Sequence, residues 1–316
     1  MTKPNYQNSS IGKISSLAKV LSIDEDNLIT IANNTNSFYY TSKRIKKANG
    51  SFREVYGVRK ELKFLQKKIL KRIFYKVKFP SYLHGSIKDL DNPRSHITAA
   101  AEHQNASILI CMDISNFFPS LKSPIIFDIW KRFFDFSPKV ADLLTKLTIF
   151  NGFLPQGATT SSGLANLAFW DSEAKIVTFL KSNGFVYTRY VDDVIISSQD
   201  YVTIKELTPI FSSVFGMFLS KGVKPNRNKI DITTSGRKMC VHNLNINSGI
   251  PTIPIKERKR IRVAVNECET QYIKNNCSES YIKLWNSTLG RVNYMIQLHY
   301  KEGSSYYNRL QIIKPL

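Results

Sequence analysis

Apolar and polar residues recur along this chain with two different periods, which predict where its helices and strands lie. Apolar residues at i, i+3 and i+4 spacing predict helices over residues 14–21, 23–32, 59–77, 123–150, 164–182 and 203–218. Runs of β-forming residues predict a strand over 107–114, a hairpin over 185–198 and a turn into another strand over 223–232. The chain is helical again from Pro254, and loop residues fill 80–104 and 151–162. At 316 residues, this pattern predicts two or three subdomains that share one cleft.

The excess of basic residues indicates the kind of molecule that this protein binds. The chain has 45 Lys and Arg against 24 Asp and Glu, and residues 43–78 alone carry fourteen basic residues against Glu54 and Glu61. In the helix predicted over 59–77, the apolar stripe leaves Lys63, Lys67 and Lys71 on a cationic outer face. A solvated surface helix is one interpretation, but a block of one sign at this density favours binding of nucleic acid.

A membrane is the competing partner for a basic protein. No apolar run approaches the ~20 residues that a spanning helix needs, and residues 1–10 are polar rather than signal-like. We therefore expect a cytoplasmic protein without a membrane partner. The four cysteines and five histidines show neither CxxC nor HExxH spacing, which disfavours disulfides and structural zinc.

Three acidic residues are the candidate chemistry. Asp113 lies near the end of the apolar run SILICMDI, and Asp192 and Asp193 lie between two β-type runs, where a hairpin turn is expected. An isolated pair of aspartates is weak evidence, because Asp is a common turn residue. Converging carboxylates suit Mg²⁺, and two such ions would support phosphoryl transfer to a hydroxyl. A glycosidase would also use paired carboxylates but would leave the basic charge unexplained.

The motifs around these acids resemble those of reverse transcriptases. YTRYVDD over residues 187–193 resembles motif C, in particular that of bacterial retron-type and group II intron-type enzymes, and DISNFFPS from Asp113 resembles motif A. LPQG at 154–157 resembles motif B, and NRNK with Asn226 and Lys229 resembles motif D. Arg53, followed by Leu62, Lys63, Leu65 and Gln66, matches the fingers segment of retron enzymes. A group II intron protein would normally carry a further maturase domain, for which 316 residues leave no room.

This resemblance implies an α+β right-hand polymerase, whose palm is an antiparallel sheet flanked by helices. The implied parts are an N-terminal extension (1–42), part of the fingers (43–105), a palm with inserted fingers elements (106–249) and a helical thumb (250–316). Asp113, Asp192 and Asp193 would be the catalytic metal ligands, and Lys229 would donate a proton to pyrophosphate. The implied nucleotide-binding residues are Arg53, Phe117, Phe118, Gln156 and Gly157, with Phe118 as the steric gate against a 2′-hydroxyl.

The resemblance also implies cofactors and partners. The cofactors would be two Mg²⁺ ions, with Mn²⁺ as an alternative. The partners would be dNTPs, a structured non-coding RNA template, its short single-stranded DNA product and a separate effector protein in anti-phage defence. The primer for DNA synthesis stays open between a 2′-hydroxyl of the same RNA, a protein and a free 3′ end. Candidate RNA-binding residues are Lys63, Lys67, Lys71, His103, Arg189, Lys256, Arg260 and Arg291.

Two departures from the retron pattern leave alternatives open. Retron enzymes typically carry NAxxH before motif A, where this chain has AAAEH over 99–103, and VTG after motif D, where it has VHN over 241–243. One alternative is another defence-associated bacterial reverse transcriptase, and a second is a non-catalytic RNA-binding scaffold on the same fold. An RNA-dependent RNA polymerase is disfavoured because Phe118 stands where a small or polar residue is expected. The oligomeric state stays open.

Overall fold

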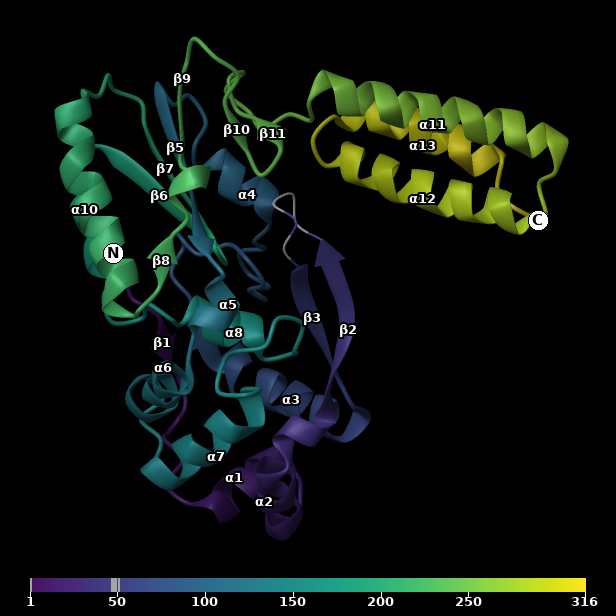
Figure 1. The fold of residues 1–316 in the computed structure, drawn as a ribbon. Coiled ribbons are helices and arrows are strands. Elements are labelled where there is room, and N and C mark those ends of the chain that lie inside the picture. Colours follow the sequence, from purple (N-terminus) through teal and green to yellow (C-terminus); the bar gives the residue numbers. More distant parts are fainter. Residues whose placement is uncertain (1, 47–49, 51) are drawn as a thin grey trace. The chain divides into compact units, whose positions relative to one another are not determined.

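A computed structural model describes residues 2–46, 50 and 52–316, with Ile204 described by its backbone alone (Figure 1). The chain divides into two compact units, one formed by residues 1–99 and 108–232 and the other by residues 100–107 and 233–316. The first unit contains the sheet and the three aspartates, and the second contains the C-terminal helices. Each unit is described by itself.

The N-terminal helices of the first unit follow the predicted pattern. Helix α1 (Ile14–Leu21) ends at Ser22, which has left-handed backbone, and α2 (Glu25–Asn33) begins where the Asp24 carboxylate accepts a hydrogen bond from the Asn27 amide. The amphipathic helix α3 (Lys60–Arg72) is confirmed but ends five residues before the predicted residue 77. The chain after it forms a 3₁₀ turn (Phe74–Lys76) and then β4 (Val77–Lys78), which pairs with β1 (Asn5–Tyr6).

An antiparallel hairpin that the apolar pattern did not predict precedes α3. It consists of β2 (Tyr39–Lys46) and β3 (Phe52–Val58). All residues of β2 after Tyr39 are exposed, so polar residues occupy both faces of the strand and no alternation marks it. The boundary expected between N-terminal extension and fingers at residue 42 falls inside β2.

A mostly antiparallel sheet carries the predicted acids. Its strands run in the order β6 (Phe185–Tyr190), β7 (Asp193–Ser198), β5 (Ile108–Ser115) and β8 (Lys224–Pro225), and β9 (Asp231–Thr234) also pairs with β5. The strand predicted over 107–114 and the hairpin over 185–198 are confirmed. The register places Asp113 directly opposite Asp193, so the two side chains lie on the same face of the sheet.

Two of the long predicted helices are interrupted. Instead of one helix over 123–150, the chain forms α6 (Ser123–Asp128), a π-helical turn (Ile129–Phe133) and α7 (Pro138–Thr148). Asp135, with a left-handed φ of 56°, and Pro138, which cannot continue a preceding helix, separate them. Instead of one helix over 164–182, the chain forms α8 (Ser161–Asn166) and α9 (Glu173–Ser182). The remaining helices of this unit are α4 (His96–Ala101, which runs two residues into the second unit), α5 (Phe117–Ser120) and α10 (Ile204–Ser220).

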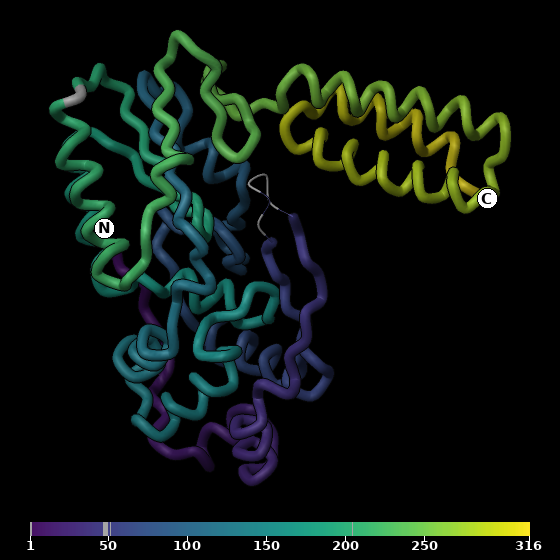
Figure 2. The backbone as a smooth tube through the Cα atoms, viewed as in Figure 1, coloured from purple at the N-terminus to yellow at the C-terminus, as the bar shows by residue number. Residues whose placement is uncertain are grey.

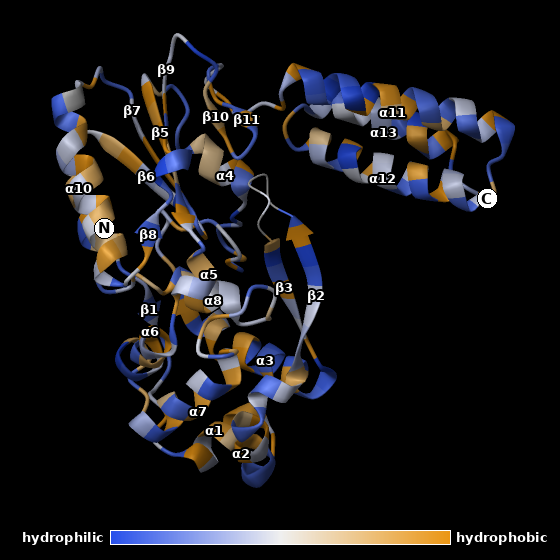
Figure 3. Cartoon of the chain, viewed as in Figure 1, coloured by the Kyte–Doolittle hydropathy of each residue, from blue (hydrophilic) through white to orange (hydrophobic). Residues whose placement is uncertain are grey.

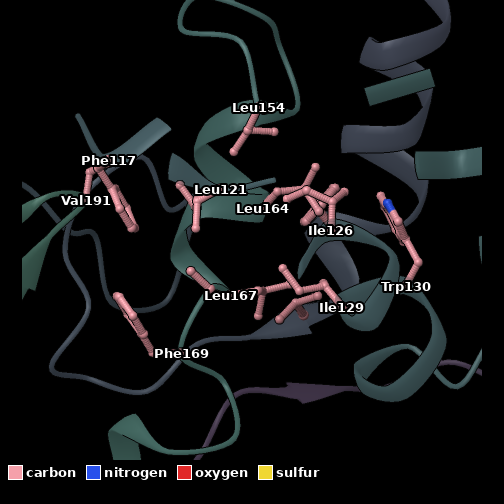
Figure 4. Packing of buried hydrophobic residues seen from close by; sticks show 14 of the residues in the cluster. Phe117, Leu121, Ile126, Ile129, Trp130, Leu154, Leu164, Leu167, Phe169 and Val191 are labelled. Atoms are coloured by element: carbon pink, nitrogen blue, oxygen red, sulfur yellow. The ribbon is translucent and has the colours of Figure 1, made fainter. Parts of the chain in front are cut away.

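An aromatic and aliphatic core joins these helices to the sheet. Trp130 is fully buried and stacks on Phe134 at 4.8 Å between ring centroids, and Phe117 stacks on Phe169 at 5.9 Å. Figure 4 shows Phe117, Phe169 and Val191 in the same cluster as Ile126 of α6 and Leu164 of α8. The core therefore extends to Val191, the residue next to Asp192.

The second unit is largely helical. The hairpin of β10 (Cys240–Val241) and β11 (Leu244–Asn245) precedes three mutually packed helices, α11 (Ile255–Lys274), α12 (Glu279–Ile296) and α13 (Tyr300–Ile312), which can be followed at the C-terminal end of the trace in Figure 2. The indole of Trp285 donates to the Leu310 carbonyl at 3.0 Å, and Arg309 pairs with Glu269 at 2.7 Å. In the described part of the chain, no helix combines the length and apolarity needed to cross a membrane.

The two faces of α3 generate a stability prediction. Ile69 is fully buried, whereas Lys67 is exposed on the polar face, and Figure 3 shows hydrophilic and hydrophobic residues around this helix. We expect Ile69→Ala to lower the free energy of unfolding by about 2–4 kcal/mol, because a buried cavity forms. We expect Lys67→Ala to change it by less than about 0.5 kcal/mol. Urea unfolding followed by circular dichroism measures both, and equal losses would contradict the assigned faces.

Candidate active site

A cavity of about 960 Å³ opens in the first unit beside the predicted catalytic residues. Strand β3, the end of β5, α5, the loop before α8 and the segment after β8 all contribute to its wall. Seven predicted site residues line the wall and come from distant parts of the chain: Arg53, Asp113, Phe117, Phe118, Gln156, Asp192 and Lys229. Asp193 and Gly157 do not line the cavity, although each lies next to a residue that does.

The motif YVDD forms the tight turn between β6 and β7. Tyr190 pairs with Asp193, so Val191 and Asp192 are the two loop residues. The sequence predicted both aspartates in the turn, but Asp193 is the first residue of β7. Val191 has a φ of 60°, which a β-branched residue rarely adopts. The Ile114 amide donates to the Asp192 carbonyl at 3.2 Å, which attaches the turn to β5. The backbone strain at Val191 is thus located beside two of the acids.

Asp113 has two side-chain partners that reduce its negative charge. The Lys229 ammonium lies 2.9 Å from Asp113 Oδ2, and the Asn226 amide nitrogen donates to the same oxygen at 2.9 Å. The backbone amide of Asn226 also donates to the Asp113 carbonyl at 2.8 Å. Asn226 was noted in the sequence only as part of a motif, and its direct bond to a predicted metal ligand makes it a further residue of the site. Its contact depends on tertiary structure, so spacing could not predict it.

Burial and neighbouring carboxylates raise the pKa values of Asp192 in the turn and Asp193 at the start of β7. Burial raises the pKa of Asp192, and the charge of Asp113 adds to the rise, whereas Arg53 and Lys229 oppose it. Burial, followed by the charges of Asp192 and Asp113, raises the pKa of Asp193 to about 6. Three carboxylates therefore share a region in which negative charge is costly.

These residues fit a hard divalent cation that is shared with a substrate. Among the described residues, no three Asp, Glu, His or Cys side chains form a group that could hold a metal by itself. Mg²⁺ usually binds through one or two carboxylates together with phosphates and water, so a complete protein cage is not required. The pKa values of Asp192 and Asp193 are raised first by burial and then by neighbouring carboxylates, and a bound cation would offset both causes.

The loop before α8 is fixed to β3 through backbone contacts. The Tyr56 amide donates to the Gln156 carbonyl at 2.8 Å. Gly157 has a φ of 110°, and a Cβ atom at this position would lie 2.6 Å from the Tyr56 carbonyl oxygen. Glycine is therefore required here both by conformation and by close approach. This attachment brings Arg53 and Gln156 to the same cavity.

The two adjacent phenylalanines differ in exposure. Phe117 is 2% exposed and packs on Phe169, whereas Phe118 is only partly buried and meets Phe117 edge-on at 6.0 Å. Asn116, with a left-handed φ of 46°, precedes them at the end of β5. Phe117 thus packs into the core while Phe118 remains able to contact a ligand in the cavity.

For two residues, Arg189 and His103, the prediction of RNA binding is wrong. The Arg189 side chain is fully buried and bonded to Glu173, and His103 is also fully buried, so neither can contact RNA in this structure. Both stand in motifs, but the motif strings do not show which way a side chain points. The other six are exposed and stay predictions: Lys63, Lys67, Lys71, Lys256, Arg260 and Arg291.

Comparison with known proteins agrees with this geometry. Residues 45–272 match the family described as reverse transcriptase (RNA-dependent DNA polymerase), so the chain belongs to this family and has the α+β right-hand polymerase fold that its motifs predicted. Its activity is that of an RNA-directed DNA polymerase, an enzyme class that uses divalent metal ions.

Within the class, the chain is a retron-type reverse transcriptase. It is 33% identical to the retron Se72 reverse transcriptase of Salmonella heidelberg (strain 579083-10), with 100% of this chain and 83% of that protein covered. It is 31% identical to the retron Ec48 reverse transcriptase of Escherichia coli, with 98% and 78% covered. A solved structure of apo telomerase from Candida tropicalis, truncated from the C-terminal domain, matches with a TM-score of 0.43, 13% identity and coverage of 73% of this chain and 61% of that one.

The raised pKa of Asp193 generates a pH prediction. The native pKa of Asp193 is about 6, whereas its pKa in the unfolded chain is about 4. The free energy of unfolding therefore falls as pH rises from about 4 to about 6, and the loss is complete at higher pH. In metal-free buffer we expect Asp193→Asn to raise the free energy of unfolding at pH 8 by about 1–2 kcal/mol, after allowance for solvent screening, and to have little effect at pH 4.

Urea unfolding at the two pH values measures this difference. The matched control is Asp91→Asn, at an exposed position in a loop, where we expect less than about 0.5 kcal/mol at either pH. If Asp193→Asn changed the free energy of unfolding equally at pH 4 and pH 8, the charge of Asp193 would not be the cause of the lower stability at pH 8.

Proposed function

We propose that this reverse transcriptase copies a structured non-coding RNA into short single-stranded DNA by Mg²⁺-dependent phosphoryl transfer. The observation that carries the proposal is the cavity in which Asp113 and Asp192 lie at one wall while Arg53, Phe118 and Gln156 lie at others. Acidic residues there suit cations, and the basic and polar residues suit a nucleoside triphosphate. The retron relatives support the choice of template and product.

The metal ligands would be Asp113 and Asp192, with Asp193 in support. Two Mg²⁺ ions, for which Mn²⁺ is an alternative, would increase the nucleophilicity of the primer hydroxyl and stabilise the leaving pyrophosphate. The residues of the chain prepare for this chemistry. Asn226 orients Asp113 through its bond to Oδ2, and the β5–β7 register keeps Asp193 on the same face as Asp113.

Three residues would bind and select the nucleotide. Arg53 is exposed on β3 and its guanidinium would contact the triphosphate. Phe118 would block the position of a 2′-hydroxyl because its ring is bulky and apolar. Gln156, placed by the backbone bond to Tyr56, would contact the nucleotide from the loop before α8, where Gly157 allows close approach to β3.

Lys229 would supply a proton to the leaving group. Its Nζ now pairs with Asp113, and the lysine side chain is 61% exposed. The carboxylate of this pair is only 18% exposed, so Nζ would leave Asp113 for the solvent and reach an incoming phosphate once a cation neutralises that carboxylate. The same side chain would then protonate the pyrophosphate oxygen.

The remaining proposals concern the macromolecular partners. The exposed cations of α3, Lys63, Lys67 and Lys71, would contact RNA phosphates, as would Lys256, Arg260 and Arg291 of the helical unit. In the proposed role in anti-phage defence, a separate effector protein would be a further partner. The departures from the retron pattern at Ala99, His242 and Asn243 would bear on which RNA is recognised rather than on catalysis.

The steric gate generates the first prediction of this subsection. We expect Phe118→Ala to raise the ratio of ribonucleotide to deoxyribonucleotide incorporation by at least about tenfold, because removal of the ring opens space for a 2′-hydroxyl. Single-nucleotide extension of a DNA primer on an RNA template measures the ratio. Phe133→Ala, which changes a partly buried phenylalanine outside the cavity, is the control for general loosening. Unchanged sugar discrimination in Phe118→Ala would exclude the gate.

The function itself is tested by the nucleic acid that copurifies with the enzyme. From a host that carries the native locus, we expect the wild type to carry a discrete DNA joined to RNA. Asp192→Ala/Asp193→Ala should carry RNA alone, because it retains the basic surfaces but lacks two carboxylates. Separate RNase and DNase digestion identifies each component. The same RNA and no DNA in both preparations would favour the scaffold alternative and contradict the copying reaction.

A further inference from the structure

Arg189 is a fully buried cation in the strand that leads to the catalytic turn. Its side chain is 0% exposed, and its guanidinium lies 5.4 Å from the centre of the Phe169 ring. A buried charge of this kind is retained only when it is paired and hydrogen-bonded, because desolvation disfavours it. The partners of Arg189 therefore indicate what the residue does.

Those partners connect the catalytic turn to two helices. Nε and one terminal nitrogen form a bidentate pair with the Glu173 carboxylate on α9, at 2.6 and 2.7 Å. That terminal nitrogen also donates to the Asn166 carbonyl at the end of α8, at 2.9 Å. The other terminal nitrogen donates to the carbonyl of Val191 at 2.9 Å. One side chain thus holds the strained residue beside Asp192 against α8 and α9.

A second segment packs against the same turn from outside the sheet. The Arg189 backbone amide donates to the Tyr82 carbonyl at 2.8 Å and its carbonyl accepts from the His84 amide at 3.0 Å. Gly85 follows, and a Cβ atom there would lie 2.6 Å from Val191 Cγ2. The Asn166 side chain donates to the Gly85 carbonyl at 2.7 Å, which connects this segment to the same network.

We propose that Arg189 is a positioning residue that, together with Glu173 and Asn166, holds Val191 in its left-handed conformation and thereby aims Asp192 and Asp193 at Asp113. Val191 would otherwise relax toward the extended backbone that β-branched residues prefer. Such relaxation would rotate the peptide that joins Val191 to Asp192. The acids would then lose their common orientation although every one of them is still present.

The proposal has a structural part and a catalytic part, and only the catalytic part rests on the proposed polymerase function. We call the hydrogen bonds from the Arg189 guanidinium to Glu173, Asn166 and Val191 the arginine fork. The structural part is that the turn becomes more mobile when the fork is removed. The catalytic part states that a loose turn weakens the binding of divalent cation and slows the chemical step, with little effect on nucleotide binding by Arg53 and Gln156.

Two variants remove the fork without leaving an unpaired buried charge. Arg189→Lys keeps a cation opposite Glu173, but its single nitrogen cannot reach Glu173, Asn166 and Val191 together. Arg189→Met/Glu173→Met replaces the whole ion pair by apolar side chains of similar size, which buried sites often tolerate. The matched control is Tyr187→Phe, which removes another hydrogen bond to Glu173, at 2.8 Å, and leaves the fork intact.

The first readout is independent of activity. Hydrogen–deuterium exchange of the amides of residues 190–193 should accelerate at least about tenfold in both test variants and remain unchanged in Tyr187→Phe. The second readout is single-nucleotide extension at saturating dNTP. Both test variants should lose about tenfold or more in kcat and need more Mg²⁺ for half-maximal rate, while the KM for dNTP changes less than about threefold.

The outcomes separate this proposal from the function on which its second part rests. An inactive wild type would contradict the polymerase function, and the exchange rates would still decide the positioning role. Unchanged exchange at 190–193 in the test variants would overturn the proposal, as would wild-type kcat and Mg²⁺ dependence in an active enzyme. Loss of cooperative unfolding in both test variants would also overturn it, because Arg189 would then be a general folding residue.

Discussion

Repulsion among three carboxylates is the constraint on which the rest of the structure depends. Cross-strand pairing places Asp113 opposite Asp193, and the turn adds Asp192, so like charges gather where burial already disfavours them. A flexible site would relieve the repulsion by separating these residues. The chain instead surrounds them with a paired sheet, a packed aromatic core and a turn that is bonded on several sides, so the carboxylates stay close together. In the proposed function, a bound cation would relieve their repulsion.

Two ion pairs near the site have opposite character. The pair of Arg189 and Glu173 is fully buried and bidentate, so its separation would strand charges in an apolar interior. The pair of Lys229 and Asp113 joins a lysine that is 61% exposed to a carboxylate that is 18% exposed, so the lysine can return to water when another cation neutralises Asp113. The first pair is suited to a permanent framework and the second to exchange during a reaction. The distinction follows from burial alone and is invisible in the sequence, where all four residues are simply charged.

Local patterns predicted the parts of this protein that depend on local physics. The apolar stripe of α3, the strand that carries Asp113 and the hairpin around Asp192 have the expected positions, because burial on one face imposes a period on the sequence. The β2–β3 hairpin was missed because β2 is exposed on both faces. Arg189 was assigned to RNA because a motif shows which residue is present but not whether it faces solvent. Asn226 was left without a role because its bond to Asp113 joins segments far apart in the chain.

The contact between Tyr56 and Gln156 has a consequence for how this enzyme can diversify. The bond joins a backbone amide to a backbone carbonyl, so it does not depend on the side chain at residue 156 and keeps the loop attached to β3. Gly157 next to it is fixed by the close approach of the Tyr56 carbonyl. Position 156 can therefore vary in size and polarity within an unchanged scaffold, whereas its neighbour cannot. Under the proposed role of Gln156 in nucleotide binding, substitutions at residue 156 would change nucleotide choice without loss of the fold.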